Sequence, residues 1–316
     1  MSSSTAIGLD IGGTKVLGVA LGAGGSVVAE HRVASPVVGL DPLVGACVAV
    51  VDALDAPDVP IGVGVAGLVD RDGRLTYAPN IPGVRDAPIR DALARATGRV
   101  VVVDNDANVA ALGEVAYGAA RGARHALMVT LGTGIGGGII LDGAIYRGAH
   151  GFAAEIGHVT VERDGPMCAC GERGHWEAIA SGSALGRMAR ELVESGSGAA
   201  ILELAGTLEE VSGEEVGVAA AHGDSDALAL LARYADNVAI GLANLANILD
   251  PERIVVSGGL VTLGPLLFDP LLRAFAVHLE GTEHRPAIPI VPAQLGERAG
   301  AIGAAVLAHS DARARA

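Results

Sequence analysis

The feature that most constrains this fold is a strand–turn–strand pattern that occurs twice along the chain. An apolar run over residues 6–11 leads into a glycine turn, and a second apolar run over residues 16–21 follows it. The same pattern restarts at residue 126 and turns at Gly132-Thr133-Gly134. Apolar runs joined by glycine turns are typical of β-hairpins. Because an internal repeat indicates a repeated architecture, the pattern predicts two α/β halves that each begin with a hairpin.

The segments after each hairpin read as further strands and helices. Asp41-Pro42 predicts a helix start, since aspartate caps helices and proline suits their first turn. Apolar residues recur every three or four positions between residues 228 and 249, which predicts one long amphipathic helix. The expected elements are, in the first half, strands over 27–33, 61–69 and 100–103 with helices over 41–54, 86–97 and 106–117, and, in the second half, strands over 137–141, 144–147, 254–256 and 288–291 with helices over 228–249 and 299–309.

Charge and composition limit the partners that this chain can have. It carries 22 basic and 36 acidic residues, a net charge of −14, with no run of lysine or arginine. A surface that binds nucleic acid is normally basic, so we expect no nucleic-acid partner. The longest uncharged apolar stretch, over residues 126–141, is broken by glycines and is shorter than the roughly 20 residues that a membrane span needs. We therefore expect no membrane partner.

The ends and the cysteines bear on location. The first five residues contain no basic segment of the kind that begins a secretory signal. The chain has three cysteines, an odd and low number that does not suit a disulfide framework. These two observations predict a cytoplasmic protein.

Three glycine-rich turns are candidates for phosphate binding: Gly12-Gly13-Thr14-Lys15, residues 132–138, and Gly258-Gly259. Such turns expose backbone N–H groups, and glycine lets a phosphate approach them closely. The P-loop motif is excluded because Lys15, the single lysine of the chain, is followed by valine instead of serine or threonine. The alternative is a plain hairpin turn, but its recurrence at the head of both halves favours phosphate binding.

A cluster of polar residues follows the predicted strand over 100–103. Asp104-Asn105-Asp106 supplies two carboxylates and an amide directly before a helix. Phosphoryl transfer to a hydroxyl group needs a carboxylate that can take its proton. The alternative is a structural role, since Asn105 or Asp106 could instead cap the helix. Spacing alone does not decide whether Asp104 or Asp106 would be the base.

Two histidines and two cysteines have the composition of a metal site. Cys168 and Cys170 are followed by His175, and His158 precedes them. Zinc is bound in a tetrahedron by four cysteine or histidine ligands, and a C-x-C pair beside two histidines suits a metal better than a redox pair. The third cysteine, Cys47, lies in the first half of the chain. We predict a zinc site, and a weakened or empty site is the alternative.

These motifs resemble those of a known family. D-I-G-G-T-K at residues 10–15 and L-G-T-G-I-G-G-G at residues 131–138 resemble the two phosphate loops of the actin-like ATPase superfamily. From about residue 6 to 307 the chain resembles the ROK family of sugar kinases and repressors. The resemblance implies a two-lobed α/β, ribonuclease H-like fold with nucleotide and sugar in the cleft. It implies a small lobe over 1–107, joined by the terminal helix over 299–316, and a large lobe over 108–298 with the zinc motif.

The resemblance also implies a nucleotide site. Asp10 would help to hold Mg²⁺, Thr133 would contact the phosphates, and Gly258 and Gly259 would lie against the adenosine. The residues expected to bind Mg²⁺ and ATP are Asp10, Gly12, Gly13, Thr14, Lys15, Gly132, Thr133, Gly134, Gly258 and Gly259.

A sugar site is implied in the same way. The family pattern E-N-D-A-N aligns with D-N-D-A-N here, which selects Asp106 as the catalytic base and leaves Asp104 one carbon shorter than the usual glutamate. E-I-G-H at residues 155–158 resembles the family's E-x-G-H, and Glu177 its trailing glutamate. The expected sugar ligands are Asn80, Asn105, Asp106, Glu155, His158 and Glu177.

The metal motif departs from the family at one position. The family reads C-x-C-G-x-x-G-C-x-E, and this chain reads C-A-C-G-E-R-G-H-W-E, so that His175 replaces the third cysteine. We expect a structural Zn²⁺ held by His158, Cys168, Cys170 and His175. Two thiolates and two imidazoles make such a site neutral, whereas three thiolates and one imidazole give it a charge of −1.

Together these expectations, with the resemblance, predict an ATP-dependent hexokinase that transfers the γ-phosphoryl group of ATP to the 6-hydroxyl of glucose, which is glucokinase activity. The alternatives are an N-acetylmannosamine, N-acetylglucosamine or fructose kinase of the same family. A sugar-sensing regulator is a further alternative, disfavoured because only nine residues precede Asp10. A homodimer or homotetramer is expected. The preferred hexose, and ATP or polyphosphate as the donor, are left open by the sequence.

Overall fold

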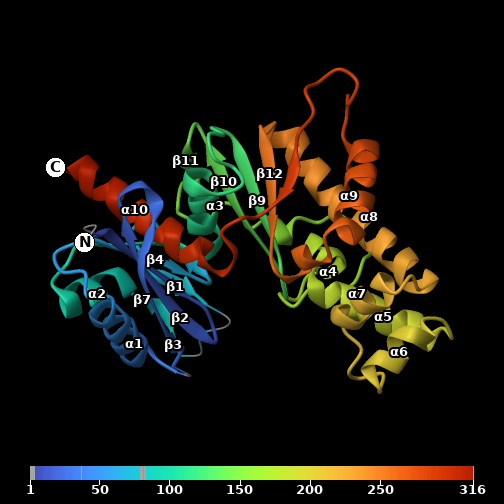
Figure 1. Cartoon of the computed structure of the whole chain (residues 1–316), viewed down its shortest axis with the longest axis horizontal. Coiled ribbons are helices and arrows are strands. Elements are labelled where there is room, and N and C mark those ends of the chain that lie inside the picture. Colours follow the sequence, from blue (N-terminus) through green and yellow to red (C-terminus); the bar gives the residue numbers. More distant parts are fainter. Residues whose placement is uncertain (1–3, 37, 79–80, 82, 316) are drawn as a thin grey trace. The chain divides into compact units, whose positions relative to one another are not determined.

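The computed structural model describes residues 4–36, 38–78, 81 and 83–315 (Figure 1). Contacts divide the chain into two compact units. Unit 1 comprises Met1–Met128, Gly137–Ala154 and Ala293–Ala316, and unit 2 comprises Val129–Gly136 and Glu155–Pro292. Each unit therefore contains one of the two predicted glycine turns.

The sheet of unit 1 begins with the predicted meander. Its strand order is β3-β2-β1-β4-β8, formed by β1 (Ser4–Ile11), β2 (Lys15–Gly22), β3 (Val27–Ala34), β4 (Ile61–Val65) and β8 (Val101–Asn105). The first three strands are antiparallel, whereas β4 pairs in parallel with both β1 and β8. Carboxyl ends of the parallel strands therefore meet at one edge, where Asp10 and Asn105 lie.

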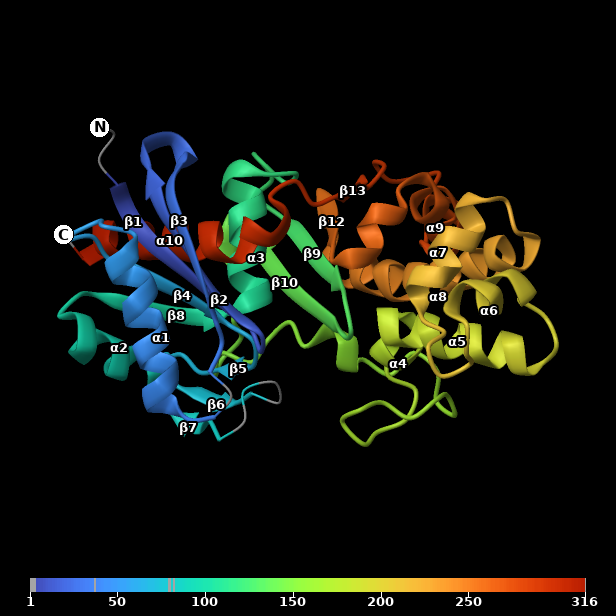
Figure 2. The same cartoon turned by 60° about the horizontal axis from the view of Figure 1, so that its bottom comes forward.

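Helices cover both faces of this sheet (Figure 2). α1 (Leu40–Ala53) and α2 (Ile89–Thr97) enclose one core with the side chains of Ile7, Leu9 and Ile11. α10 (Ala299–Arg315) packs on the other face, against Ala6, Leu17 and Val19. Residues alternate between faces along a strand, so Gly8 and Asp10 lie on the α10 side. Gly8 is needed there, because a Cβ would overlap the carbonyl oxygen of Ala301.

Several predicted boundaries are wrong. The closing helix runs to Arg315 and not to 309, the last strand begins at Ile290 and not at 288, and the strand predicted over 144–147 ends at Ile145. Three further differences have an identifiable structural cause. The strand predicted over 61–69 ends at Val65, since Gly67 has a φ of +143° and turns the chain into a separate three-stranded sheet. That sheet contains β5 (Leu68–Val69), β6 (Leu75–Tyr77) and β7 (Arg85–Ala87). The helix predicted from residue 86 begins at Ile89, because β7 pairs with β6 instead. α1 begins at Leu40, before Asp41, and its N-cap Gly39 provides no side-chain cap.

The second sheet repeats the order of the first. It runs β11-β10-β9-β12-β13, formed by β11 (Ala144–Ile145), β10 (Ile135–Leu141), β9 (Ala126–Leu131), β12 (Arg253–Ser257) and β13 (Ile290–Pro292). In both sheets, the three strands of a meander lie side by side in the order third, second, first, and two strands from later in the sequence are added next to the first strand. The predicted duplication is therefore confirmed in the strand order.

α3 (Asp106–Tyr117) starts where the sequence predicts, directly after β8. It packs along α10 and so belongs to unit 1, whereas the predicted lobe division places most of it in the second lobe. Gly303 permits this packing, because a Cβ at that position would overlap the carbonyl oxygen of Val109 on α3.

The remaining helices build unit 2. They are α4 (Trp176–Ala180), α5 (Gly182–Glu194), α6 (Ala199–Ala205), α7 (Gly213–Ala221), α8 (Ser225–Leu249) and α9 (Pro265–His278). Unit 2 also contains two short 3-10 turns, η2 (Ile156–His158) and η3 (Gly259–Leu263). Unit 1 contains two others, at Ala23–Gly25 and Gly296–Arg298. α8 is the predicted long helix and contacts α4, α7 and α9. Its predicted apolar stripe is buried at Leu231, Val238 and Leu242.

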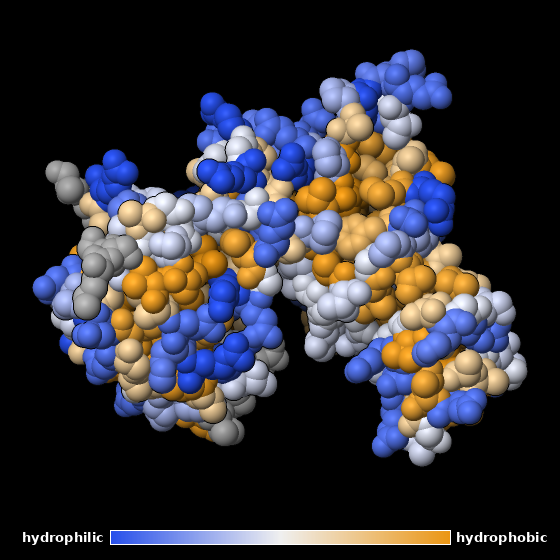
Figure 3. Space-filling model, in the orientation of Figure 1, coloured by the Kyte–Doolittle hydropathy of each residue, from blue (hydrophilic) through white to orange (hydrophobic). Residues whose placement is uncertain are grey.

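Some large apolar side chains of unit 2 remain on the surface. Ile248 of α8 is 77% exposed and Val277 of α9 is 81% exposed. Figure 3 shows hydrophobic surface over the part of the molecule where Figure 1 labels α8 and α9. Within the described residues, the helices are all too short or too polar to cross a bilayer.

Candidate active site

The first glycine turn joins β1 to β2 in unit 1. The backbone N–H of Gly12 donates to the carbonyl oxygen of Lys15 at 3.0 Å. Ser35 supports the turn from one side, since its N–H donates to Thr14 O at 3.0 Å and its hydroxyl to Gly12 O at 2.7 Å. Gly13 and Thr14 are exposed at the tip. The support through Ser35 leaves this tip accessible to a ligand.

Asp10 and Asp106 form an acidic pair beside that turn. Burial and, to a smaller extent, the negative charge of Asp106 together raise the pKa of Asp10 to about 7, against the opposing effect of Lys15. Burial likewise raises the pKa of Asp106. Gly300 of α10 packs against Asp10, because a Cβ there would lie 2.7 Å from its Cγ. The predicted Mg²⁺ ligand and the predicted base are thus electrostatically coupled.

Asn105 is the N-cap of α3. Its Oδ1 accepts hydrogen bonds from the backbone N–H groups of Ala107 at 2.9 Å and Asn108 at 3.1 Å. Its Nδ2 donates to Gly67 O at 3.1 Å. The capping role, which the sequence offered as the alternative, is therefore present in the structure. A contact between Asn105 and a sugar stays a prediction.

Asp104 is a structural carboxylate, 4% exposed. Its Oδ2 accepts from Arg147 Nε at 2.5 Å, and its Oδ1 accepts from the N–H of Asn105 at 2.8 Å and from Asn108 Nδ2 at 2.9 Å. Arg147 is a residue that the sequence analysis missed, since nothing in the spacing links it to a carboxylate so far along the chain. Asp106 Oδ1 accepts from the N–H of Ala107 at 2.9 Å, so its contacts are local and differ from those of Asp104. The role of Asp106 as the base stays a prediction.

Glu114 of α3 is a second functional support that the sequence analysis missed. The side chain is fully buried and accepts from the N–H groups of Ala119 at 2.6 Å, Gln294 at 3.0 Å and Leu295 at 2.8 Å. Three backbone donors satisfy this buried carboxylate. It thereby anchors the segment that leads into α10.

Asn80, predicted as a sugar ligand, lies outside the described residues.

The second glycine turn joins β9 to β10. The N–H of Gly132 donates to Gly134 O at 3.0 Å, and the N–H of Gly182 donates to Gly132 O at 2.7 Å. Gly258 packs against β9, with a φ of +97° and no room for a Cβ beside Leu131. The predicted nucleotide-binding residues of unit 2 are therefore gathered around one turn.

A pocket of about 860 Å³ opens beside this turn, entirely within unit 2. Gly132, Thr133 and Gly259, three of the residues predicted to bind the nucleotide, line it. Their contact with a nucleotide stays a prediction. α5, α7 and η3 supply the other walls, through Ser183, Gly186, Arg190, Ser212, Gly213, Glu214, Gly217, Val218, Ala221, Leu260, Thr262 and Leu263. The lining is largely apolar or glycine, with polar groups at a few places, which is the usual composition of a small-molecule site.

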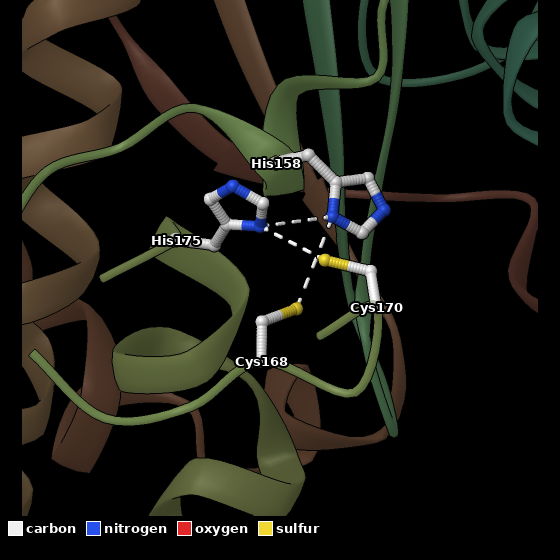
Figure 4. Close-up of side chains that lie close together, drawn as sticks. All are labelled: His158, Cys168, Cys170 and His175. Atoms are coloured by element: carbon white, nitrogen blue, oxygen red, sulfur yellow. Dashed lines mark hydrogen bonds between the residues drawn. The ribbon is translucent and has the colours of Figure 1, made fainter. Parts of the chain in front are cut away.

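The four predicted metal ligands converge in unit 2 (Figure 4). His158 Nδ1 lies 3.3 Å from His175 Nδ1 and 3.9 Å from Cys168 Sγ, while Cys170 Sγ lies 3.2 Å from His175 Nδ1. All four donor atoms lie within 4.8 Å of one another. A tetrahedral zinc with ordinary bond lengths needs donors about 3.3–3.8 Å apart. The cluster therefore fits zinc, with Nδ1 of each histidine directed inward.

Glu155 and Glu177 flank this cluster. Glu155 precedes η2, and its carbonyl oxygen accepts from the N–H of His158 at 3.1 Å. The carboxylate of Glu177 accepts from the N–H of Ile135 at 2.9 Å, and its Oε1 lies 3.5 Å from Cys168 Sγ. The predicted sugar ligands of unit 2 are thus close to the metal cluster, and one of them also contacts the strand after the glycine turn.

Comparisons with known proteins extend over both units. The sequence profile of the ROK family matches residues 6–311. A glucokinase of Streptomyces coelicolor is 39% identical over 312 residues, which cover 96% of this chain and 97% of the relative. The crystal structure of a ROK family glucokinase from Streptomyces griseus, in complex with glucose and AMPPNP, matches with a TM-score of 0.84 and 39% identity, covering 96% of this chain and 99% of that one. The ROK hexokinase of Thermus thermophilus matches with a TM-score of 0.82 and 36% identity, covering 98% and 99%.

Proposed function

The chain belongs to the ROK family, and from that premise we propose that it is a glucokinase that transfers the γ-phosphoryl group of ATP to the 6-hydroxyl of glucose. Its fold is the two-lobed, mixed α/β fold of the actin-like superfamily, as the sequence predicts. The main support is the likeness, over nearly the whole chain, to a ROK glucokinase whose structure contains glucose and AMPPNP.

The pocket of unit 2 supports a nucleoside triphosphate as the phosphoryl donor. Its largely apolar walls end at the turn that contains Gly132 and Thr133. A nucleoside would occupy the apolar part while its phosphates reach the backbone N–H groups of the turn. Polyphosphate has no apolar portion to fill such a space. ATP is therefore the donor that suits this pocket.

The acidic pair of unit 1 supports the chemistry. Mg²⁺ prefers oxygen ligands, and Asp10 is the carboxylate that would hold it, where it would neutralise charge on the transferred phosphoryl group. Asp106 would accept the proton of the sugar hydroxyl as that oxygen attacks. Burial raises the pKa of both carboxyl groups, and the charge of Asp106 adds to the rise at Asp10. A raised pKa brings Asp106 closer to the working pH, which suits a general base.

The metal cluster would orient the sugar site. With Nδ1 of His158 on zinc, its Nε2 becomes an N–H donor whose tautomer is fixed, directed away from the cluster (Figure 4). A sugar hydroxyl could accept from that nitrogen and donate to the carboxylates of Glu155 and Glu177. The zinc would have a structural role, since its four ligands all come from the protein.

One assay tests the proposed function. Formation of the sugar phosphate is measured with glucose, mannose, fructose, N-acetylglucosamine and N-acetylmannosamine, with ATP as donor and with polyphosphate in its place. We expect the highest kcat/KM with glucose and ATP. A preference for an N-acetylhexosamine or fructose would replace the proposed substrate with one of the family alternatives. Sugar binding without turnover would instead support a sugar-sensing regulator.

The division into lobes at residues 107 and 108, the homodimer or homotetramer and the cytoplasmic location stay predictions. Light scattering on the purified protein measures the second of these directly. Ile248 of α8 and Val277 of α9 are exposed, so polar substitutions at these two positions would leave the buried core undisturbed while the oligomeric state is measured.

A further inference from the structure

We infer that Glu177 is a positioning residue for the turn Gly132–Gly134, so that one carboxylate links nucleotide binding to the cysteine–histidine cluster. The inference rests on the proposed function, because it assumes that this turn binds the phosphates of ATP. It adds a second role to a residue that the family resemblance marks only as a sugar ligand.

The first observation is a peptide group that is held at both ends. The peptide between Gly134 and Ile135 donates its N–H to Glu177 Oε2 at 2.9 Å. Its carbonyl oxygen accepts from the N–H of Gly132 at 3.0 Å. A peptide group is planar, so fixing both of its polar ends fixes its orientation. Glu177 thereby sets the closing peptide of the turn whose N–H groups would face the phosphates.

The second observation is a close approach at Gly134. A Cβ on this residue would overlap Glu177 Oε2 and would lie 3.0 Å from Cδ. The carboxylate therefore packs directly on the backbone of the turn, and glycine is needed for that contact. The backbone of Gly134 is not in the left-handed region, so the constraint comes from Glu177 and not from φ.

The third observation is that Glu177 is itself held firmly. Its neighbour Trp176 is 1% exposed, and Trp176 Nε1 donates to the carbonyl oxygen of Asn237 on α8 at 3.0 Å. Gly241 of α8 leaves no space for a Cβ beside the indole ring. On the other side, His175 and Cys168 belong to the metal cluster, and Cys168 Sγ lies 3.5 Å from Glu177 Oε1. The carboxylate can therefore transmit the position of these elements to the turn.

A carboxylate has about four acceptor positions on its two oxygens, so the contact with Ile135 leaves capacity for a sugar hydroxyl. The two roles make different predictions. A residue that only binds sugar affects the glucose KM and leaves nucleotide affinity in the absence of sugar unchanged. A positioning residue of the turn changes nucleotide affinity even when no sugar is present.

Calorimetry with AMPPNP, without sugar, on the full chain distinguishes the two roles. For Glu177→Ala we expect about tenfold weaker AMPPNP binding, because the closing peptide loses its acceptor. Glu177→Gln keeps an amide oxygen that can accept from Ile135, and it should retain most of the AMPPNP affinity while still raising the glucose KM. Glu172→Ala removes an exposed carboxylate from the same loop and serves as the matched control, with unchanged AMPPNP affinity.

Elemental analysis of each variant shows whether zinc is retained. Unchanged AMPPNP affinity in a zinc-loaded Glu177→Ala protein would overturn the inference. If Glu177→Ala loses its metal, a double-mutant cycle with Gly134→Ala decides. Gly134→Ala should weaken AMPPNP binding in the native background and do so less when Glu177 is alanine, since the overlapping carboxylate is then absent. Additive effects in that cycle would also overturn the inference.

Failure of the native protein to phosphorylate any hexose would refute the proposed function, and the AMPPNP affinities would still decide the role of Glu177.

Discussion

The turns Gly12–Thr14 and Gly132–Gly134 occupy equivalent places in their hairpins and have different surroundings. Each joins the first two strands of a meander, and the first glycine donates its N–H at 3.0 Å, to Lys15 O in the first turn and to Gly134 O in the second. The first turn lies beside the buried acids Asp10 and Asp106 and beside Lys15, whose Nζ lies 2.6 Å from Glu297. The second is held by Glu177 and Gly182 and opens on a largely apolar pocket.

The difference shows how a duplicated backbone acquires two functions. A hairpin turn supplies N–H groups in both units, and the residues packed around it decide what those groups serve. Around the first turn, carboxylates provide sites for a cation and a proton. Around the second, apolar side chains and glycines provide room for a nucleoside. This separation predicts different effects for substitutions in the two units.

The largest effect is expected at Asp106. Asp106→Asn removes the proposed base of unit 1, so kcat should fall by about 10²–10⁴, on the order of 3–5 kcal/mol of barrier. Glucose binding should remain detectable, because asparagine keeps the size of the side chain and its acceptor oxygen. Steady-state kinetics and calorimetry measure the two quantities, and a kcat near the native value would remove Asp106 from this role.

The metal cluster of unit 2 should give the next largest effect. His175→Ala should lose zinc, raise the glucose KM by roughly tenfold to a hundredfold and lower the melting temperature, with a smaller change in AMPPNP affinity. His175→Cys is the matched control, since it supplies a thiolate and should keep both metal and activity. Elemental analysis and kinetics decide the matter. Substoichiometric zinc in fully active native enzyme would contradict the ligand assignment.

The third effect is on the free energy of unfolding, because a charged Asp10 carboxylate is buried beside the first turn. Its pKa is about 7 in the folded protein and near 4 when unfolded, so the folded state binds more protons between these values. Stability from this group is therefore present below about pH 4 and is lost as the pH rises through 7. Asp10→Asn should stabilise the Mg²⁺-free protein at pH 8 by a few kcal/mol at most, on the order of 1.4 kcal/mol for each unit of raised pKa.

Urea unfolding of the native protein and Asp10→Asn at pH 8 and pH 5 measures this effect. The stabilisation should be smaller at pH 5, where nearly all of Asp10 in the folded native protein is already protonated. If Asp10→Asn stabilised the protein no more at pH 8 than at pH 5, burial of the charged Asp10 carboxylate would not lower the stability of the native protein. Activity should fall in the same variant, since Asp10 is the proposed Mg²⁺ ligand.

The smallest effect is expected at Lys15. Glu297 accepts from Lys15 at 2.6 Å and from Arg32 at 3.0 Å, so these charges support the first turn from the 3-10 turn that precedes α10. Arginine can make the same ion pair, and such exposed pairs contribute little. Lys15→Arg should therefore retain at least a tenth of the native kcat/KM. A loss beyond a hundredfold would identify Lys15 as a phosphate clamp that arginine cannot replace.

Local patterns in the sequence were sufficient for several parts of this molecule. The two hairpins, the start of α3 at Asp106 and the four-residue metal cluster follow from turn glycines, helix capping and ligand spacing, each of which acts over short distances along the chain. The paired strand orders follow from the same repeat. These features are predictable because the residues that specify them are neighbours in sequence.

Only the tertiary structure decided what individual site residues contact. Asp104 is occupied by Arg147, which lies on a distant segment, and this separates it from Asp106. Glu177 reaches the backbone of Ile135, and Gly8 admits α10 to the sheet. No periodicity or spacing links these pairs, since they meet only when strands and helices pack. The sequence by itself determined the elements and the kinds of chemical group, and the tertiary structure decided their partners because long-range packing sets which groups touch.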